Sequence, residues 1–366
     1  MASENYCEVR TTQGIFRDWS MVSVSWGIET DWVRQFQFQL AEPDDRMRVL
    51  RPGARCDIAL AGQVAVSQGV VRVRQVGFDA RRHGIQVAGL GRPGVLTQSS
   101  FEPKQGVFRG YSFESIAKSV LQRYGLKFRL DSVPDAASIP YRGVAVMHGE
   151  TPFSFLERLA RQRGIWLRTE ADGTVVGGVP EGGSTVTLEE GVNILGGTLY
   201  EEDPGVGEIV FRSQQPGSDS LFGKPASEIS AETKIGSGTG RRIGLAEEPA
   251  GQRELQARAD MEAAATLAEN LRVVITHQGW LKPGTGALWN LLDPVTVKSR
   301  TLFGSDNAVS LRAWSVTCSQ SSDAPGTTTT VEMVSSALFG QRYPDATKSD
   351  DFYSPKASPA VPEAET

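Results

Sequence analysis

The sequence predicts an α+β fold that is mainly β, with two β-barrel-like domains flanking an α+β insert. Apolar residues alternate with period two through most of residues 1–100 and 180–340, as expected for half-buried strands. Helical periodicity replaces this pattern over residues 101–179, and it occurs there twice. After residue 340 the chain has several prolines, alternating charge and few aliphatic residues, so we expect a disordered tail over 341–366.

The first region, residues 1–100, predicts a small antiparallel barrel or sandwich. In the segment FQFQL, Phe36 and Phe38 face one way and the intervening glutamines face the other. Turns containing glycine separate the segments that follow. The same alternation recurs in three later pairs of residues: Ile58 with Leu60, Val71 with Val73, and Ile85 with Val87.

The insert, residues 101–179, contains an internal repeat. GYSFESIAKSVLQRYG begins at Gly110, and GETPFSFLERLARQRG begins 39 residues later at Gly149. Each copy places a capping residue, Ser112 or Thr151, two positions after its first glycine. Each copy also ends at a glycine, as helices commonly do, and runs directly into a strand-like segment, LKFRL or IWLRT. The repeat therefore predicts a compact module of two helix-strand units.

The third region, residues 180–340, predicts a second barrel that carries one long helix. Strands are expected at EIVF (208–211), at PVTVK (294–298) and around Trp314, Val316 and Cys318. The helix is expected from Arg253 to Leu271, with an ion pair between Glu254 and Arg258 supporting it. The polar, glycine-rich stretch at 213–252 predicts a long loop, either functional or mobile.

Charge is distributed unevenly along the chain. The whole sequence carries 38 basic and 43 acidic residues, a formal net charge of −5, which does not favour nucleic-acid binding. Residues 1–180 carry 23 basic and 18 acidic groups, whereas residues 181–366 carry 15 and 25. Two explanations stay open: ordinary solvated surfaces, or opposite faces that meet different partners or neighbouring subunits.

The termini and cysteines favour a soluble protein made in the cytoplasm. The first residues lack the basic and apolar segments of an export signal, and no apolar stretch approaches the length needed to span a bilayer. We therefore expect no membrane insertion by this chain. Cys7, Cys56 and Cys318 are far apart and form no CxxC pair, so we expect three reduced structural thiols.

Motifs for common chemistries are absent from the sequence. It contains no HExxH, GxSxG or CxxC. The segment Gly217–Lys224 departs from a phosphate-binding loop in spacing and is followed by proline, and Gly236–Gly240 lacks a βαβ context. His148 and Glu150 have the H-x-E spacing of zinc deaminases without the downstream cysteine pair. All of these segments are better explained as structural.

The remaining candidates for catalysis are isolated. His83 and His277 have no neighbouring residues that suggest a triad. Adjacent acids could supply the two carboxylates of a glycosidase, but such pairs are usually solvated. They occur at Glu189-Glu190, Glu201-Glu202-Asp203 and Glu247-Glu248. We therefore assign no catalytic, cofactor-binding or metal-binding residue and expect no cofactor.

Several segments, taken in order, resemble one known family. They are HGIQVAGLGR (83–92), the two repeated helices, IWLRTEADGTVV, and the stretch 253–299, in which a helix leads into a Gly-Trp strand. In this order they resemble the baseplate hub of contractile-tailed bacteriophages, the Mu-like tail protein P group related to the late control protein D family. The stretch at 213–252 departs from the pattern expected of that family.

The resemblance implies a structural, non-enzymatic protein of the tail baseplate in the virion. It implies a homotrimer that encloses a central channel and joins a hexameric tail tube protein to a trimeric central spike protein. Other baseplate proteins are further implied partners, and DNA is implied only as passing cargo. Three chains with two similar barrels each would form a ring of six barrels. Such a ring would match a threefold spike to a sixfold tail tube.

Two alternatives stay open. One is the spike-hub component of a bacterial contractile secretion system. Such proteins usually continue into an OB-fold and a β-helical spike, whereas this chain stops at residue 366 after a proline-rich segment. The other is a cell-wall hydrolase carried on the tail.

Overall fold

The computed structural model describes residues 6–30, 32–40, 49–78, 83–101, 107–180, 185–214, 223, 228–236, 238–304, 307–322 and 326–339. Strands dominate these residues, as the sequence predicts. The expected tail at 341–366 and nearly all of Gly217–Lys224 lie outside the described residues, so the tail stays a prediction.

The first hundred residues form a set of antiparallel strands in the order β3-β4-β7-β6-β5-β1-β2. The predicted strand FQFQL is β4, and it buries Phe36 and Phe38 on one face. One expectation is wrong: Val71 is buried, but Val73 is 54% exposed, because a β-bulge between them breaks the alternation. The strands are β1 (Cys7–Thr11), β2 (Gly14–Phe16), β3 (Met21–Gly27), β4 (Gln35–Leu40), β5 (Arg55–Leu60), β6 (Gln63–Phe78) and β7 (His83–Leu90).

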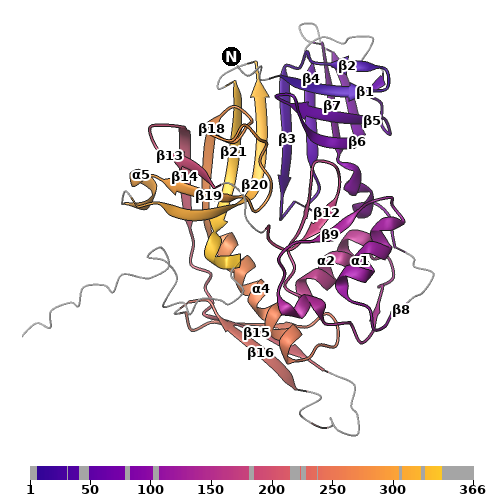
Figure 1. The fold of residues 1–366 in the computed structure, drawn as a ribbon, viewed down its shortest axis with the longest axis vertical. Coiled ribbons are helices and arrows are strands. Elements are labelled where there is room, and N and C mark those ends of the chain that lie inside the picture. The colour runs from indigo at the N-terminus through magenta and orange to yellow at the C-terminus, as the bar shows by residue number, and fades with distance from the viewer. Residues whose placement is uncertain are drawn as a thin grey trace, which may run out of the picture.

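The insert contains the two predicted helix-strand units, which Figure 1 shows below the first β region. Helix α1 (Phe113–Gln122) is capped by the Ser112 hydroxyl, which accepts a hydrogen bond from the Ser115 amide. Helix α2 (Pro152–Gln162) is capped in the same way by Thr151. The strands that follow, β9 (Phe128–Leu130) and β11 (Leu167–Thr169), pair with opposite edges of β12 (Val175–Gly177). The two units therefore share one small sheet.

Short elements complete the insert. They are the 3-10 helices η2 (Arg92–Thr97) and η3 (Asp135–Ser138) and the paired strands β8 (Val107–Phe108) and β10 (Val144–Ala145). The apolar stripes of α1 and α2 meet in a core of their own, as their periodicity predicts. That core includes Phe113, Ile116, Val120, Phe155, Leu156 and Leu159.

The third region adds six strands to the same large sheet. The predicted strand PVTVK is β19, and the residues from Trp314 to Cys318 lie in β20 with alternate side chains buried. The elements are β13 (Val186–Glu189), β14 (Ile194–Glu201), β18 (Leu271–Gln278), β19 (Pro294–Lys298), α5 (Arg300–Phe303), β20 (Val309–Ser321), β21 (Thr327–Ser335) and the 3-10 helix η4 (Ser336–Phe339).

The stretch at 213–252 is not one long loop, which corrects the sequence-based expectation. Its described residues include β16 (Ile229–Lys234) and β17 (Arg241–Leu245), which pair with the two edges of β15 (Glu208–Ser213). Helix α4 (Gln252–Asn270) covers this small sheet and buries Leu255, Ala259 and Ala263 against it. The strands escaped prediction because polar and glycine residues mask their alternation.

The expected pair between Glu254 and Arg258 is also corrected. The guanidinium of Arg258 is buried against the ring of Phe211. It bonds instead to Glu247, at 3.0 Å from Nε, and to Glu262, at 2.8 Å from Nη1. An ion pair between exposed side chains of one helix is weak, so helical spacing alone does not determine whether it forms. A buried guanidinium instead needs the carboxylates that are packed beside it.

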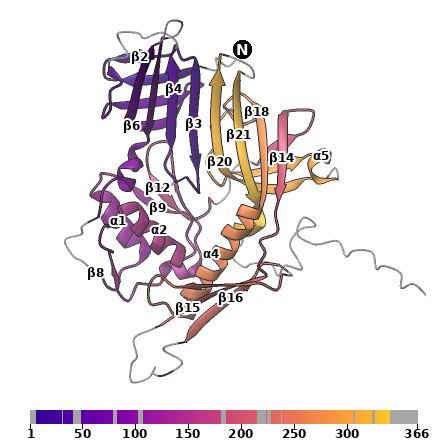
Figure 2. The ribbon, with the colours of Figure 1, turned by 180° about the vertical axis from the view of Figure 1, so that it is seen from behind.

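One continuous sheet of 13 strands joins the two β regions. The junction is an antiparallel pairing of β3 with β20, in register from Met21 opposite Ser321 to Gly27 opposite Ser315. Figures 1 and 2 show the two β halves side by side, with the insert and α4 beneath them. A single hydrophobic core extends through both halves. The proposed domain boundaries at residues 100, 180 and 340 stay a prediction.

Candidate assembly surfaces

The described residues contain no group of three or more His, Cys, Asp and Glu side chains that could hold a metal ion. The H-x-E segment is used structurally: His148 is exposed, and the carboxylate of Glu150 accepts a hydrogen bond from Nε of Arg158 at 2.8 Å. The glycines at 236–240 also have a structural use. The backbone of Gly238 packs so closely on Gly207 that a Cβ on Gly207 would lie 1.8 Å from the carbonyl oxygen of Gly238.

His277 is a core histidine. Its Nε2 accepts a hydrogen bond from the indole nitrogen of Trp289 at 2.9 Å, and its Nδ1 lies 3.0 Å from the carbonyl oxygen of Gln278. This pair of contacts fits the neutral ring with its proton on Nδ1. Burial lowers the pKa of His277 from its ordinary value, so the ring stays neutral. His83 begins β7, and its side chain lies outside the described residues.

All three cysteines are free and buried. Burial raises the pKa of Cys56 and the pKa of Cys318 to about 12, and it raises the pKa of Cys7 as well. Because the thiolate is the reactive form of cysteine, these thiols are chemically inert and serve as small apolar side chains.

Two of the acidic pairs hold parts of the chain together. Glu190 accepts hydrogen bonds from the hydroxyls of Ser299, at 2.7 Å, and Thr301, which ties β13 to α5. These hydrogen bonds lower the pKa of Glu190. In the pair at 247–248, Glu247 bonds to Arg258, and Glu248 bonds to Arg158. The third group, Glu201-Glu202-Asp203, is exposed at the end of β14.

The insert is fixed to the first β half through Trp32. Its carbonyl oxygen accepts a hydrogen bond from the Thr169 hydroxyl at 2.6 Å, and its indole nitrogen donates to the Glu157 carboxylate at 3.0 Å. Burial raises the pKa of Glu157. Glu157 belongs to α2 and Thr169 to β11. Both the helix and the strand of the second repeat are therefore anchored to the loop that contains Trp32.

The insert is also fixed to the third region through Arg158. This side chain bonds to Glu150 in the insert and to Glu248 before α4, and all three side chains are nearly buried. The aromatic rings of Trp166 and Trp314 make a second contact between these regions, with 5.1 Å between their centroids. The insert is therefore braced against both β halves.

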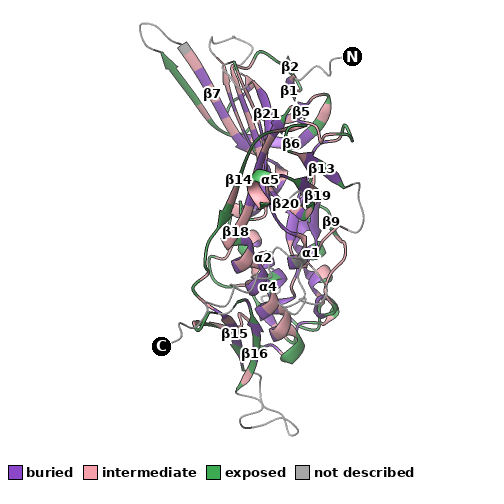
Figure 3. Cartoon of the chain, turned by 90° about the vertical axis from the view of Figure 1, so that its left-hand side faces the viewer, coloured by how far each residue is buried: buried purple, intermediate pink, exposed green. Residues whose placement is uncertain are grey.

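Exposed apolar side chains gather at two places on the large sheet. One is the outer half of β6, where Val73, Val76 and Phe78 are 54%, 52% and 85% exposed. Figure 3 shows the β6–β7 hairpin projecting beyond the rest of the sheet. The other place is β14 and the turn before it, with Val192, Leu195 and Tyr200 at 57% exposure or more. Exposed apolar groups in contiguous patches are typical of interaction surfaces.

No helix among the described residues has the length and apolar character needed to cross a membrane.

Comparison with known proteins gives similarity to phage tail proteins. Residues 93–178 match the family model of the second domain of gp44-like baseplate hub proteins. Over 309 residues the chain is 26% identical to the baseplate hub protein gp44 of Escherichia phage Mu, covering 79% of this chain and 78% of that protein. The chain is therefore similar to a phage baseplate hub protein over most of its length. This confirms the resemblance seen in the sequence, and the expected location in the tail baseplate of a virion agrees with it.

Solved structures of tail proteins share the fold of this chain. The 43 kDa tail protein of prophage MuSo2 from Shewanella oneidensis has a TM-score of 0.77 and 20% identity, covering 92% of this chain and 100% of that chain. A tail protein from Neisseria meningitidis MC58 has a TM-score of 0.75 and 19% identity, covering 91% and 97%. The E. coli c3393 protein, described as a component of the type VI secretion system, has a TM-score of 0.56 and 14% identity, covering 91% and 78%.

Proposed function

We propose that this chain forms a trimeric hub that joins a hexameric tail tube to a trimeric central spike and encloses the channel through which DNA passes. The observation that carries the proposal is the single sheet that unites two β halves through β3 and β20. Three such chains would present six β halves in a ring, which would meet a threefold partner on one side and a sixfold partner on the other.

The proposed role is structural and needs no reaction. The ionisable side chains considered above support this role, because most of them brace the fold: His277, Glu150, Glu190, Glu247 and Glu248 are all hydrogen-bonded within the chain. The three thiols are buried with raised pKa values. Zymography on peptidoglycan tests the hydrolase alternative directly. A zone of clearing would contradict the structural role.

Mass measurement in solution tests the trimer. Sedimentation equilibrium or native mass spectrometry at micromolar concentration should give three times the mass of one chain. The same sample should bind purified tail tube protein and spike protein in pull-down experiments. A stable monomer that binds neither partner would contradict the proposal.

A second candidate is the corresponding position in a bacterial contractile secretion system. The fold shared with the E. coli c3393 protein favours it. The genes beside the coding sequence discriminate between the two: tube, tape measure and spike genes of a phage support the first candidate, and secretion-system genes support the second.

A further inference from the structure

Several strands of the large sheet have an edge that no described strand covers, among them β2, β13, β14 and the outer half of β6. The last two lie at the places where exposed apolar side chains gather. Strand β14 is the last strand in the sheet order and pairs with β18, apart from an isolated bridge between Ile194 and Glu190. On the other side, β6 pairs with β5 only as far as Val70, opposite Arg55, whereas its pairing with β7 continues to Phe78. The outer half of β6, residues 72–78, therefore has one open edge among the described residues. We call these two edges the β14 edge and the β6 edge.

Both edges expose apolar side chains that suit pairing with another chain. Proteins usually protect open edges with short strands, charges or bulges. Each of these edges contains a bulge, between Val71 and Val73 in β6 and between Ile194 and Gly196 in β14, yet its apolar side chains stay exposed. Here the β6 edge exposes Val73 on one face of the hairpin and Val76 on the other. The β14 edge exposes Leu195 and Tyr200. The apolar side chains make each edge suitable for pairing with a further strand.

Gly196 in β14 is compatible with the approach of a further strand, whereas a Cβ on Gly197 would lie 2.8 Å from Cδ1 of Ile275 within the chain. Gly196 and Gly197 lie inside the strand, where glycine is destabilising relative to residues with side chains. At Gly196 a Cβ would meet no atom within 4 Å, so packing within this chain does not require glycine there. Glycine inside a strand is typical of β-bulges, such as the one between Ile194 and Gly196, and of places where another backbone approaches closely. The open side of β14 fits such an approach.

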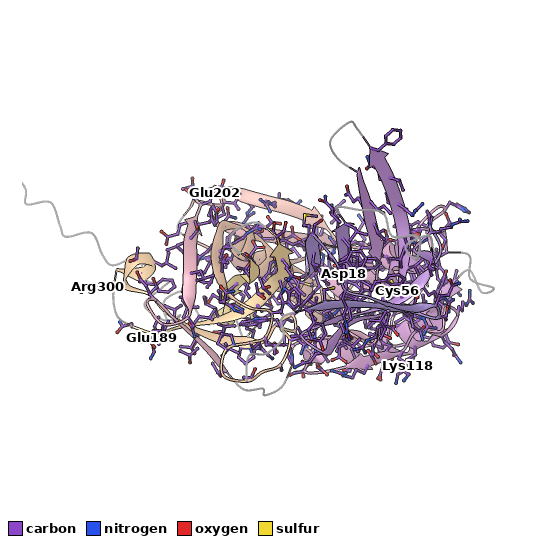
Figure 4. The ribbon with its side chains drawn as sticks, turned by 90° about the horizontal axis from the view of Figure 1, so that it is seen from above. Asp18, Cys56, Lys118, Glu189, Glu202 and Arg300 are labelled. Atoms are coloured by element: carbon purple, nitrogen blue, oxygen red, sulfur yellow. The ribbon has the colours of Figure 1, made fainter. Side chains whose placement is uncertain are left out.

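The two edges carry opposite charge. Arg72 and Arg74 lie on the outer half of β6, and Glu201, Glu202 and Asp203 lie at the end of β14. Arg72, Glu201 and Glu202 are exposed and form no ion pair among the described residues. Figure 4 shows Glu202, beside β14, and Cys56, on the strand next to β6, toward opposite ends of the molecule. One molecule therefore cannot bring its own two edges together.

We propose that the β6 edge of one copy pairs with the β14 edge of the next copy, so that the chains join head to tail. Two different surfaces that complement each other make a heterologous contact, which closes into a ring when the rotation between copies permits it. The basic and acidic ends set the order and register of the two strands. This proposal rests on the proposed trimeric hub. It adds which strands form the contacts between neighbouring chains of the ring.

Charge reversal on the full-length chain tests the contact. The first variant, R72E/V73E, places two negative charges on exposed positions of the β6 edge. It should weaken the trimer at least tenfold in sedimentation equilibrium, because like charges then face each other across the contact. Combining it with E201K/E202K in the same chain should restore the trimer, because the attraction is then reversed in sign. Circular dichroism should show unchanged folding in every variant, since all four positions are exposed.

Matched controls use exposed charges elsewhere. R109E lies in the insert and E228K lies before β16, and both should remain trimeric. If the unaltered chain is trimeric and R72E/V73E stays equally trimeric, the edge contact is wrong while the proposed hub stands. If R72E/V73E dissociates and the combined variant does not recover, the β14 edge is not the partner. A monomeric unaltered chain would overturn both proposals.

Discussion

Single buried side chains hold this fold together, and the buried ring of His277 makes part of the stability depend on pH. Because burial lowers the pKa of His277, the folded chain takes up a proton less readily than the unfolded chain. The stability that the neutral ring contributes is therefore present above a pH of about 6.5 and is lost as the pH falls below it.

We expect the H277Q variant to show this difference. A glutamine oxygen can still accept the hydrogen bond from the Trp289 indole, but it does not titrate. The gap in free energy of unfolding between the native chain and H277Q should shrink as the pH falls from 7 to 5. Denaturant titrations at each pH measure it, with H148Q as the control at an exposed histidine. A gap that stays constant would contradict the role given to His277.

Arg158 has a larger expected effect at any pH. Replacing it with methionine keeps the aliphatic volume but leaves the carboxylates of Glu150 and Glu248 nearly buried without their cation. Removing one partner of a buried ion pair costs about 3–5 kcal/mol, and we expect R158M to lose about 3 kcal/mol in a denaturant titration. The K118M control breaks the exposed pair with Glu114, and it should lose less than about 0.5 kcal/mol. Equal losses in the two variants would refute this account.

At the scale of elements, the two helices of the insert depend on their caps. Replacing Thr151 by alanine removes the hydroxyl that accepts from the Ser154 amide, and S112A does the same at α1. Each change should lower the free energy of unfolding by about 1 kcal/mol. The S115A control leaves the capped backbone amide in place and should change stability by less than about 0.5 kcal/mol. Thermal or chemical unfolding of the three variants decides the matter.

The elements that the sequence predicted well are those whose pattern is local. The stripes and caps of α1 and α2 and the alternation in β4 and β19 follow from neighbouring residues, so they could be read directly. The strands β16 and β17 were missed because few of their residues are apolar, and the two apolar residues of β17, Ile243 and Leu245, are exposed. The bulge after Val71 was missed because it depends on the pairing with β7.

At the scale of the molecule, the sequence could not predict how the two β regions meet. Strands β3 and β20 lie almost 300 residues apart, and nothing local to either strand identifies the other as its partner. The candidate surfaces share this property. Neither the open edge of β6 nor that of β14 is visible until the order of the strands is known. The uneven charge was visible in the sequence, but the placement of Arg72 on β6 and of Glu201 on β14 was not.

The final segment of the chain gives a further prediction. Residues 341–366 contain few aliphatic side chains, so deleting them should leave the folded core intact. The melting temperature should change by less than about 2 °C, which corresponds to less than about 1 kcal/mol for a chain of this size. Differential scanning calorimetry of the truncated and full-length chains measures it. A clear drop would indicate that the segment docks on the described part of the chain.

The pairing of β3 with β20 has a mechanical consequence. Hydrogen bonds between antiparallel strands run perpendicular to the strand direction. A pull on the two halves along these strands therefore loads the seven residue pairs between Met21 and Gly27 in shear, all at the same time. A pull perpendicular to the strands would instead break the hydrogen bonds between these pairs one after another. A load applied along this seam is shared across its whole length, which makes it a stiff link between the two halves of the chain.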